Sequence, residues 1–144
     1  MSNKLYNDKI IVNTSDTHKI IALSKKNGAK LWEIRANLNI YGDLVVKDSI
    51  GFVGVSDGKL LKINLEKGEI IDEFQTQESK INYSDFFDSK NNLKAQELIS
   101  KYSGNYEKIY ESFENLDGIY SSSVIEGNSL YFCTVNGKIF ALEI

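Results

Sequence analysis

The residues that could do chemistry are few, and the most suggestive group lies near the start of the chain. His18, the only histidine, follows Ser15 and Asp16, and Ser24 comes a few residues later. Serine, histidine and aspartate make up hydrolytic triads, in which the imidazole takes the proton of the serine hydroxyl. His18 lies in a predicted hairpin turn, however, where a solvated turn residue is the plainer interpretation. We predict no catalytic residue in this group.

A reactive thiol or a metal site has even less support. Cys133, the only cysteine, lies in a predicted strand between Phe132 and Thr134. Since no basic residue adjoins it in the sequence, we expect it to be a small buried apolar side chain. One cysteine excludes an internal disulfide and indicates a reducing, cytoplasmic location. A single histidine and a single cysteine in different repeats offer no metal-ligand set, so we predict neither metal nor cofactor.

The remaining candidates for catalysis also have a structural interpretation. The run Gly51–Gly54 lies inside a predicted strand and lacks the strand-to-helix context of a phosphate-binding loop. Asp85 with Asp88, or Glu107 with Glu111, could serve as general acid and base. No pocket is evident for them, and carboxylates on an exposed helix face are the ordinary case. We therefore predict that the protein is not an enzyme.

A stripe of tyrosines gives the strongest indication of binding. Tyr102, Tyr106 and Tyr110 recur every four residues, which places them on one side of a helix. They either dock that helix onto the rest of the fold or form an exposed surface of the kind found at protein interfaces. The predicted partner-binding residues are the tyrosines and the acids around them: Asp85, Asp88, Tyr102, Tyr106, Glu107, Tyr110, Glu111, Glu114 and Asp117.

The charge of the chain is concentrated in this same segment. The net charge is -3, and residues 83–120 contain four lysines against seven acidic residues. Nucleic-acid binding needs clustered lysine and arginine, so we predict no nucleic-acid partner, whereas a basic protein would fit. No stretch approaches the roughly 20 apolar residues of a membrane span, which predicts no membrane partner.

The elements that must position these residues follow a repeat of 40 residues. Residues 19–34 and 59–74 align so that Ile20 falls on Leu60, Ile34 on Phe74 and Gly28 on Gly68. A third, partial copy covers residues 136–142. A fixed period of this length is the signature of a repeat architecture, and the turns and alternating apolar residues within each copy predict antiparallel strands.

We predict one mainly β domain, residues 1–144, with propeller-type repeats at 9–37, 41–77 and 119–144. The first copy is expected to begin near Lys9, and Ile119 to Ile125 is expected to be a strand. Between the second and third copies, helical periodicity predicts a helical insert at 85–117, with Gly104 ending one helix and Asn105 capping the next. This insert has about the length of one missing blade.

The repeats resemble those of quinoprotein-type (PQQ-like) β-propellers. The resemblance rests on Ile20–Leu23, Gly28 and Leu31-Trp32, and then on Asp57-Gly58 and Asn136-Gly137 in the later copies. It implies about three antiparallel blades, a partial or open β-propeller. Asp72 stands where the repeat would have a second docking tryptophan. The adjacent cysteines and calcium site of family members that use the quinone are missing, so that cofactor is not implied.

We hypothesise a non-catalytic protein-binding module. In size and acidity the chain is similar to small bacterial immunity proteins, including those of contact-dependent growth inhibition systems. That similarity implies an inhibitor that masks a basic, nuclease-type toxin in the cytosol. The alternatives are a propeller scaffold for protein assembly and a propeller protomer that associates with itself.

Overall fold

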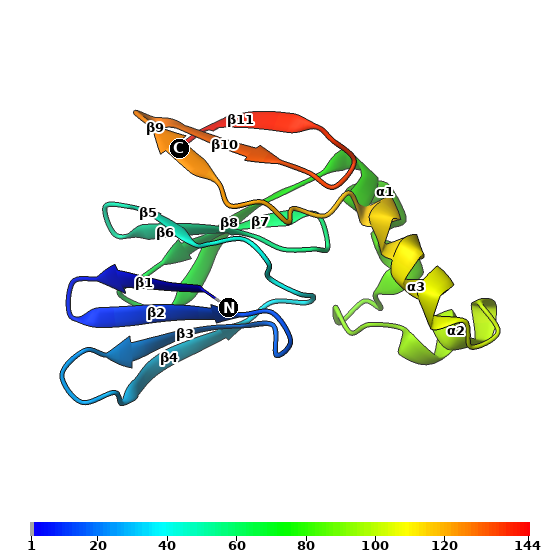
Figure 1. Cartoon of the computed structure of the whole chain (residues 1–144), viewed down its shortest axis with the longest axis horizontal. Coiled ribbons are helices and arrows are strands. Elements are labelled where there is room, and N and C mark those ends of the chain that lie inside the picture. The colour runs from blue at the N-terminus through cyan, green and yellow to red at the C-terminus, as the bar shows by residue number, and fades with distance from the viewer. Residues whose placement is uncertain (1) are drawn as a thin grey trace.

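Three antiparallel sheets, stacked in chain order, make up most of the computed structural model, which describes residues 2–144 (Figure 1). Blade 1 consists of β1 (Ser2–Tyr6), β2 (Lys9–Thr14), β3 (Lys19–Ser24) and β4 (Lys30–Arg35). Blade 2 consists of β5 (Val45–Lys47), β6 (Ile50–Gly54), β7 (Lys59–Asn64) and β8 (Glu69–Gln75). Blade 3 consists of β9 (Val124–Glu126), β10 (Ser129–Cys133) and β11 (Ile139–Glu143). The predicted three-bladed, mainly β fold is confirmed.

The 40-residue repeat is visible in the strand pairing itself. Ile20 pairs with Ile34 in blade 1, and Leu60 pairs with Phe74 in blade 2. The register also shifts at the same repeat position in both blades, directly after Ala22 and directly after Lys62. Equivalent residues therefore occupy equivalent places in the two sheets, because the same alternation of apolar side chains must face the same neighbour.

Two strand boundaries differ from the prediction. Blade 1 begins at Ser2 rather than near Lys9, because the polar segment before the first turn pairs with β2 along its whole length. Its side chains are largely exposed, so the sequence has no clear alternation there. The strand expected from Ile119 to Ile125 is shorter, and β9 covers only Val124–Glu126. Ile119 instead donates its amide hydrogen to the Val55 carbonyl and is fully buried.

The core lies in two layers between the three blades. Ile11, Ile20 and Ala22 of blade 1 pack with Val53, Leu61 and Ile63 of blade 2. Phe52 and Leu60, on the other side of blade 2, pack with Leu130 and Phe132 of blade 3. Sheets with one apolar face need a partner on that face, and blade 2, apolar on both faces, lies between the other two.

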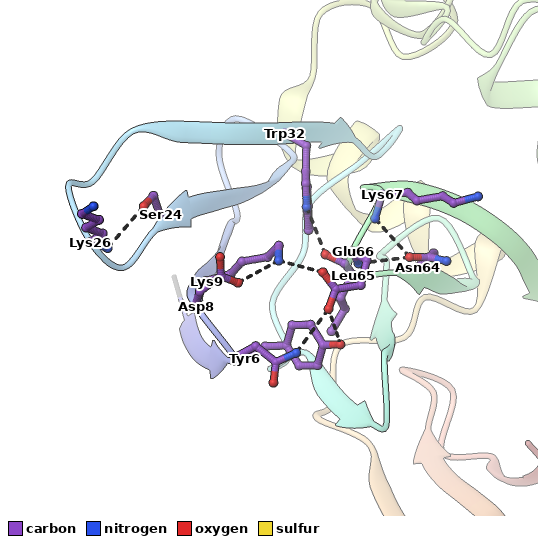
Figure 2. A network of polar contacts seen from close by, with 11 residues as sticks. Tyr6, Asp8, Lys9, Ser24, Lys26, Trp32, Asn64, Leu65, Glu66 and Lys67 are labelled. Atoms are coloured by element: carbon purple, nitrogen blue, oxygen red, sulfur yellow. Dashed lines mark hydrogen bonds and ion pairs between the residues drawn. The ribbon is translucent and has the colours of Figure 1, made fainter.

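Trp32 joins blade 1 to blade 2 (Figure 2). Its indole Nε1 donates a hydrogen bond to the Leu65 carbonyl at 3.1 Å. The ring covers Gly68, where a Cβ atom would lie 2.4 Å from the indole Cγ. Glu66, in the same turn of blade 2, accepts from Lys9 and from the Tyr6 hydroxyl, each at 2.8 Å. The junction thus combines a docked ring with a polar network.

The polar network shifts the pKa values of its charged members. The carboxylates of Glu66 and then Asp8 raise the pKa of Lys9 to about 12. In return, Lys9 and the Tyr6 hydroxyl hold the pKa of Glu66 below its ordinary value. Both turns are therefore charged and paired at neutral pH.

We expect Trp32→Phe to lower the free energy of unfolding by about 1–2 kcal/mol, since it removes one hydrogen bond and part of the ring that covers Gly68. Urea unfolding followed by far-ultraviolet circular dichroism measures this loss, because the variant lacks the only tryptophan. Tyr41→Phe, at an exposed aromatic residue, is the control and should change little. Equal stability of the two variants would contradict the docking role.

Blade 2 and blade 3 are joined differently. Asp72 stands at the position equivalent to Trp32, opposite Lys62 in the pairing of β7 with β8, and its side chain is exposed. The ring centroids of Phe74 and Phe140 lie 5.2 Å apart, and Phe132 completes the aromatic group. A groove of about 250 Å³ remains beside Asp72. Aromatic packing therefore takes over the role that the docked indole has at the first junction.

The helical insert lies across one end of the three blades (Figure 1). It consists of α1 (Gln77–Phe86), α2 (Ala95–Lys101), α3 (Tyr106–Ser112) and a 3₁₀ turn, η1 (Phe113–Leu116). Asn105 caps α3 as predicted, its side chain accepting from the Lys108 amide. Helix α1 was not predicted, and the insert therefore begins at Thr76. Blades 2 and 3 pack directly on each other, so the insert elaborates the connection between them and does not fill the place of a blade.

Candidate protein-binding site

The insert is anchored on the β6–β7 turn of blade 2. The Thr76 hydroxyl accepts from the Ser79 amide and donates to the Leu116 carbonyl at 3.0 Å, joining the two ends of the insert. The Ser79 hydroxyl donates to the Asp57 carbonyl at 2.6 Å. Gly58, at the tip of this turn, has φ +84°, and a Cβ atom there would lie 2.2 Å from the Leu116 carbonyl oxygen. Both ends of the insert thus pack against Gly58.

A buried polar cluster lies under the same turn. The Asp57 carboxylate accepts from the Lys59 amide at 3.2 Å and from the Tyr83 hydroxyl at 3.4 Å. Asn37 donates to the same hydroxyl at 2.6 Å, and Lys59 lies over the Tyr83 ring while pairing with Glu73 at 3.0 Å. Burial raises the pKa of Asp57 to about 6. Burial also raises the pKa of Tyr83, whose proton therefore stays on the hydroxyl.

Asp117 is buried, which corrects the expectation that it flanks an exposed surface. It is the left-handed residue that ends η1, with φ +49°, and its carboxylate accepts from the Asn136 amide at 3.1 Å. Lys138, from the β10–β11 turn, lies 3.6 Å from the same carboxylate and pairs with Glu78 of α1. Asp117 therefore attaches the insert to blade 3 and offers nothing to a partner.

Helix α3 holds the exposed part of the predicted surface. Tyr106 and Tyr110 are 62% and 72% exposed, one turn apart on the same side of the helix. Glu107, Glu111 and Glu114 are also exposed and follow the adjacent side. On the opposite side Ile109, Ser112 and Leu116 are buried. The tyrosines therefore lie at the boundary between the packed and the acidic sides of α3.

An apolar groove of about 240 Å³ runs between the insert and blade 1, and the two tyrosines line it. Blade 1 and its link to β5 contribute three residues, and the insert contributes the rest: His18, Leu38 and Asn39, then Leu93, Ala95, Leu98, Ile99, Tyr106, Ile109, Tyr110 and Phe113. Beyond His18 a second, more polar hollow of about 470 Å³ is lined by Arg35 and Lys90 among others. The boundary between the insert and blade 1 thus has acidic residues beside α3 and basic residues at its other end.

The other predicted site residues lie apart from this groove. Tyr102 ends α2 and is half-buried against the core, since the turn at Ser103 and Gly104 separates it from α3. The three tyrosines therefore do not form one helical stripe. Asp88 is occupied structurally: its carboxylate accepts from the Lys90 and Asn92 amides.

Those two hydrogen bonds, with that of Asn92 the larger effect, lower the pKa of Asp88. Asp85 is exposed near the end of α1 and lines a separate hollow with Lys94 and Lys101. Neither aspartate contributes to the tyrosine-lined groove.

The catalytic candidates lie in separate parts of the structure: Ser15, Asp16 and His18 share the β2–β3 turn, whereas Cys133 lies on β10. His18 has φ +57°, is half-buried and lines the groove, and burial lowers its pKa. Its neighbour Ser15 donates to Asp16 at 3.0 Å. Cys133 is exposed on β10, so the expectation of a buried thiol is wrong. Among residues 2–144 no cluster of three or more histidine, cysteine or acidic side chains could hold a metal ion, and no helix in that range is long and apolar enough to cross a membrane.

The sequence reasoning missed the contribution of the link between blades 1 and 2. Leu38 and Asn39 line the groove, and Asn39 also accepts the Ser56 amide through its carbonyl. The alternation of Ala36, Leu38 and Ile40, all buried, was a signal that this link packs against something. What it packs against was decided by the insert, which folds back over it from more than 50 residues further along the chain.

Comparison with known proteins supports the fold and nothing finer. No protein-family model matches the sequence, and no curated protein matches it. Among solved structures, the chain is similar to BamB from Moraxella catarrhalis, with a TM-score of 0.64 and 14% identity over 98% of this chain. A europium-containing methanol dehydrogenase has the same TM-score with 9% identity over 98% of the chain. The computationally designed protein Ika4 has a TM-score of 0.60 with 10% identity over 99%.

The chain spans only part of these proteins: 32% of BamB, 22% of the methanol dehydrogenase and 64% of Ika4. BamB and the methanol dehydrogenase are PQQ-type propeller proteins, so the resemblance stated from the repeat holds at the level of the fold. At these identities the likeness extends to the arrangement of the blades alone. The described chain is a three-bladed, propeller-like fold with a helical insert across one end.

Proposed function

We propose that this chain is a non-catalytic protein-binding module that holds a partner against α3 and the groove beside it. The observation that carries the proposal is the pair Tyr106 and Tyr110, both more than 60% exposed at the rim of an apolar groove. Tyrosine supplies a large contact area with a polar tip, which is why it is enriched at interfaces. The insert is fixed at both ends, so the surface is largely formed before a partner arrives.

The partner that fits is a basic protein, and we propose an immunity-type role in which it is a nuclease-type toxin masked in the cytoplasm. Glu107, Glu111 and Glu114 are exposed beside the tyrosines and would attract a positively charged surface. Masking needs no catalytic group on this chain, only an interface of standard size, about 800 Å² on each partner. The inhibition would be steric and electrostatic.

Co-expression with the product of the adjacent upstream gene tests the role directly. Rescue of growth from that product, together with a stable complex on purification, is the expected result. No toxicity and no complex would overturn the immunity role and favour the alternative of an assembly scaffold.

Charge reversal locates the surface within such a complex. We expect Glu107→Lys, Glu111→Lys and Glu114→Lys together to slow association at least about tenfold at low salt, because steering by opposite charge acts mainly on the on-rate. Stopped-flow or biosensor kinetics measure it. The control is the reversal of Asp43, Glu69 and Asp72, three exposed acids of blade 2 and its preceding link, which changes the net charge equally. Equal slowing by both triple variants would place the contact elsewhere.

A further inference from the structure

Blade 1 has an apolar face that points away from blade 2. Ile10 and Val12 of β2 pair with Leu23 and Ile21 of β3, which places all four side chains on one side of the sheet. Leu5 of β1 extends this ladder opposite Ile10 and is 65% exposed. No other segment of residues 2–144 forms a blade on this face, in contrast to the opposite face, which packs on blade 2.

Blade 3 has a matching face that points away from blade 2. Tyr131 of β10 pairs with Ala141 on one side and Val124 on the other, and all three are exposed. Ile139, opposite Cys133, is 77% exposed, the highest value among the large apolar side chains of the described chain. Isolated exposed apolar residues need no explanation, but a contiguous apolar sheet face does.

The repeat shows what these two faces correspond to. Tyr131 and Ile139 lie 79 residues after Phe52 and Leu60, the blade 2 residues that are buried against blade 3. Ile21 and Leu23, on the outward face of blade 1, lie 40 residues before Leu61 and Ile63, which are buried against blade 1. Both open faces therefore consist of positions that are covered wherever a neighbouring blade exists. The outward face of blade 1 and the outward face of blade 3 could therefore pack on each other as adjacent blades do within the chain.

We propose that two copies of this chain stack head to tail, with blade 3 of each copy against the outward face of blade 1 of the other. Two such contacts close a ring of six blades, within the range of four to eight that propellers adopt. The contact joins different faces of the two copies, and closure of the ring prevents it from continuing into a filament. The helical insert lies across one end of the blades, away from both faces (Figure 1).

Charges at the rim of the proposed contact are complementary. At the junction within the chain, the β7–β8 turn of blade 2 presents Glu66 to Lys9 of blade 1. In the β3–β4 turn of blade 1, Lys26 stands at the position that Glu66 has in blade 2. The two residues make the same local hydrogen bond: the Lys26 amide donates to the Ser24 side chain, and the Glu66 amide donates to the Asn64 side chain (Figure 2). The facing turn in the new contact is β9–β10, and the exposed Glu126 is the last residue of β9, directly before it. The two turns of the proposed contact therefore have opposite charges, as at the internal junction, but here the β3–β4 turn carries the positive charge and its neighbour the negative one.

Light scattering coupled to size-exclusion chromatography tests the proposal on the 144-residue chain. We expect a mass of about 33 kDa, twice the 16.3 kDa of one chain. Ile139→Lys should give the single-chain mass, because it introduces a charge into the centre of the contact. Ile81→Lys is the matched control: Ile81 is 67% exposed on α1, outside both faces, and its variant should stay dimeric. A single-chain mass for the unchanged protein, or equal masses for the two variants, overturns the proposal.

A charge swap tests the orientation of the two copies. Lys26→Glu should raise the dissociation constant of the dimer about tenfold, since each ring loses two attractive pairs. Adding Glu126→Lys should restore the affinity, because the pair is re-formed with its charges exchanged. Two changes that simply add, with no restoration, would contradict the head-to-tail arrangement. The result is independent of the proposed partner-binding function, which concerns α3.

Discussion

Replacing Gly58 by alanine is expected to lower the free energy of unfolding by about 2–5 kcal/mol, from a left-handed backbone cost of about 1–2 and an overpacking cost of about 1–3. The added methyl group would lie 2.2 Å from the Leu116 carbonyl oxygen and 2.6 Å from Ser79 Cβ and Thr76 Oγ1. None of these atoms can withdraw easily, because each belongs to a residue whose hydrogen bonds close the insert. For a chain of this size the melting temperature should fall by about 10 °C.

Gly28→Ala separates the two causes. Gly28 also has a left-handed backbone, with φ +73°, but a Cβ atom there meets nothing within 4 Å. That variant should therefore lose only the backbone contribution, about 1–2 kcal/mol. Thermal and urea unfolding of both variants give the comparison. Equal losses at the two positions would mean that the insert does not close tightly on the β6–β7 turn.

Replacing Asp57 by asparagine is expected to remove a pH dependence of stability. The buried carboxyl has its pKa raised to about 6 and keeps its proton up to that pH, whereas in the unfolded chain it loses the proton near its ordinary pKa of 3.8. Between these values the folded state binds more protons than the unfolded state, so the stability of the unchanged protein falls as pH rises through this window. Asparagine is neutral throughout, keeps an acceptor for the Lys59 amide, and carries no such loss.

The measured quantity is the difference in unfolding free energy between Asp57→Asn and the unchanged protein. It should move in favour of the variant by about 2 kcal/mol between pH 4 and pH 7, because the carboxyl of the unfolded chain is already more than half ionised at pH 4. Urea unfolding at several pH values within this range provides it. Lys59, Glu73 and Tyr83 surround the carboxyl and stay in place in the variant, so the difference reports the Asp57 charge and its interactions with them.

Asp43→Asn, at an exposed aspartate, is the control and should show no such drift. Glu66 and Glu78, whose pKa values are lowered by their lysine partners, act in the opposite direction, since their stabilisation is lost as pH falls. A constant difference between pH 4 and pH 7 for Asp57→Asn would contradict the burial argument.

The sequence alone determined the blades, because their evidence is local and repeated. Alternating apolar residues and a turn glycine recur every 40 residues, so β6, β7 and β8 could be placed within a residue or so of their observed bounds. The same holds for α3, whose cap, Asn105, lies directly before the helical periodicity. Strand β1 and helix α1 escaped prediction, since β1 is largely exposed and α1 buries only Ser79 and Phe86.

The tertiary structure alone decided which residues of the insert face solvent and which faces of the blades stay open. Tyr102, Tyr110 and Asp117 were all predicted to belong to the partner-binding surface, yet Tyr102 is half-buried against the core and Asp117 is buried, with Tyr110 alone of the three exposed. The physical reason is that exposure depends on where a segment returns to contact the rest of the chain, and these returns join residues tens of positions apart. Periodicity describes one element at a time, so it fixes which side chains share a face but not what covers that face.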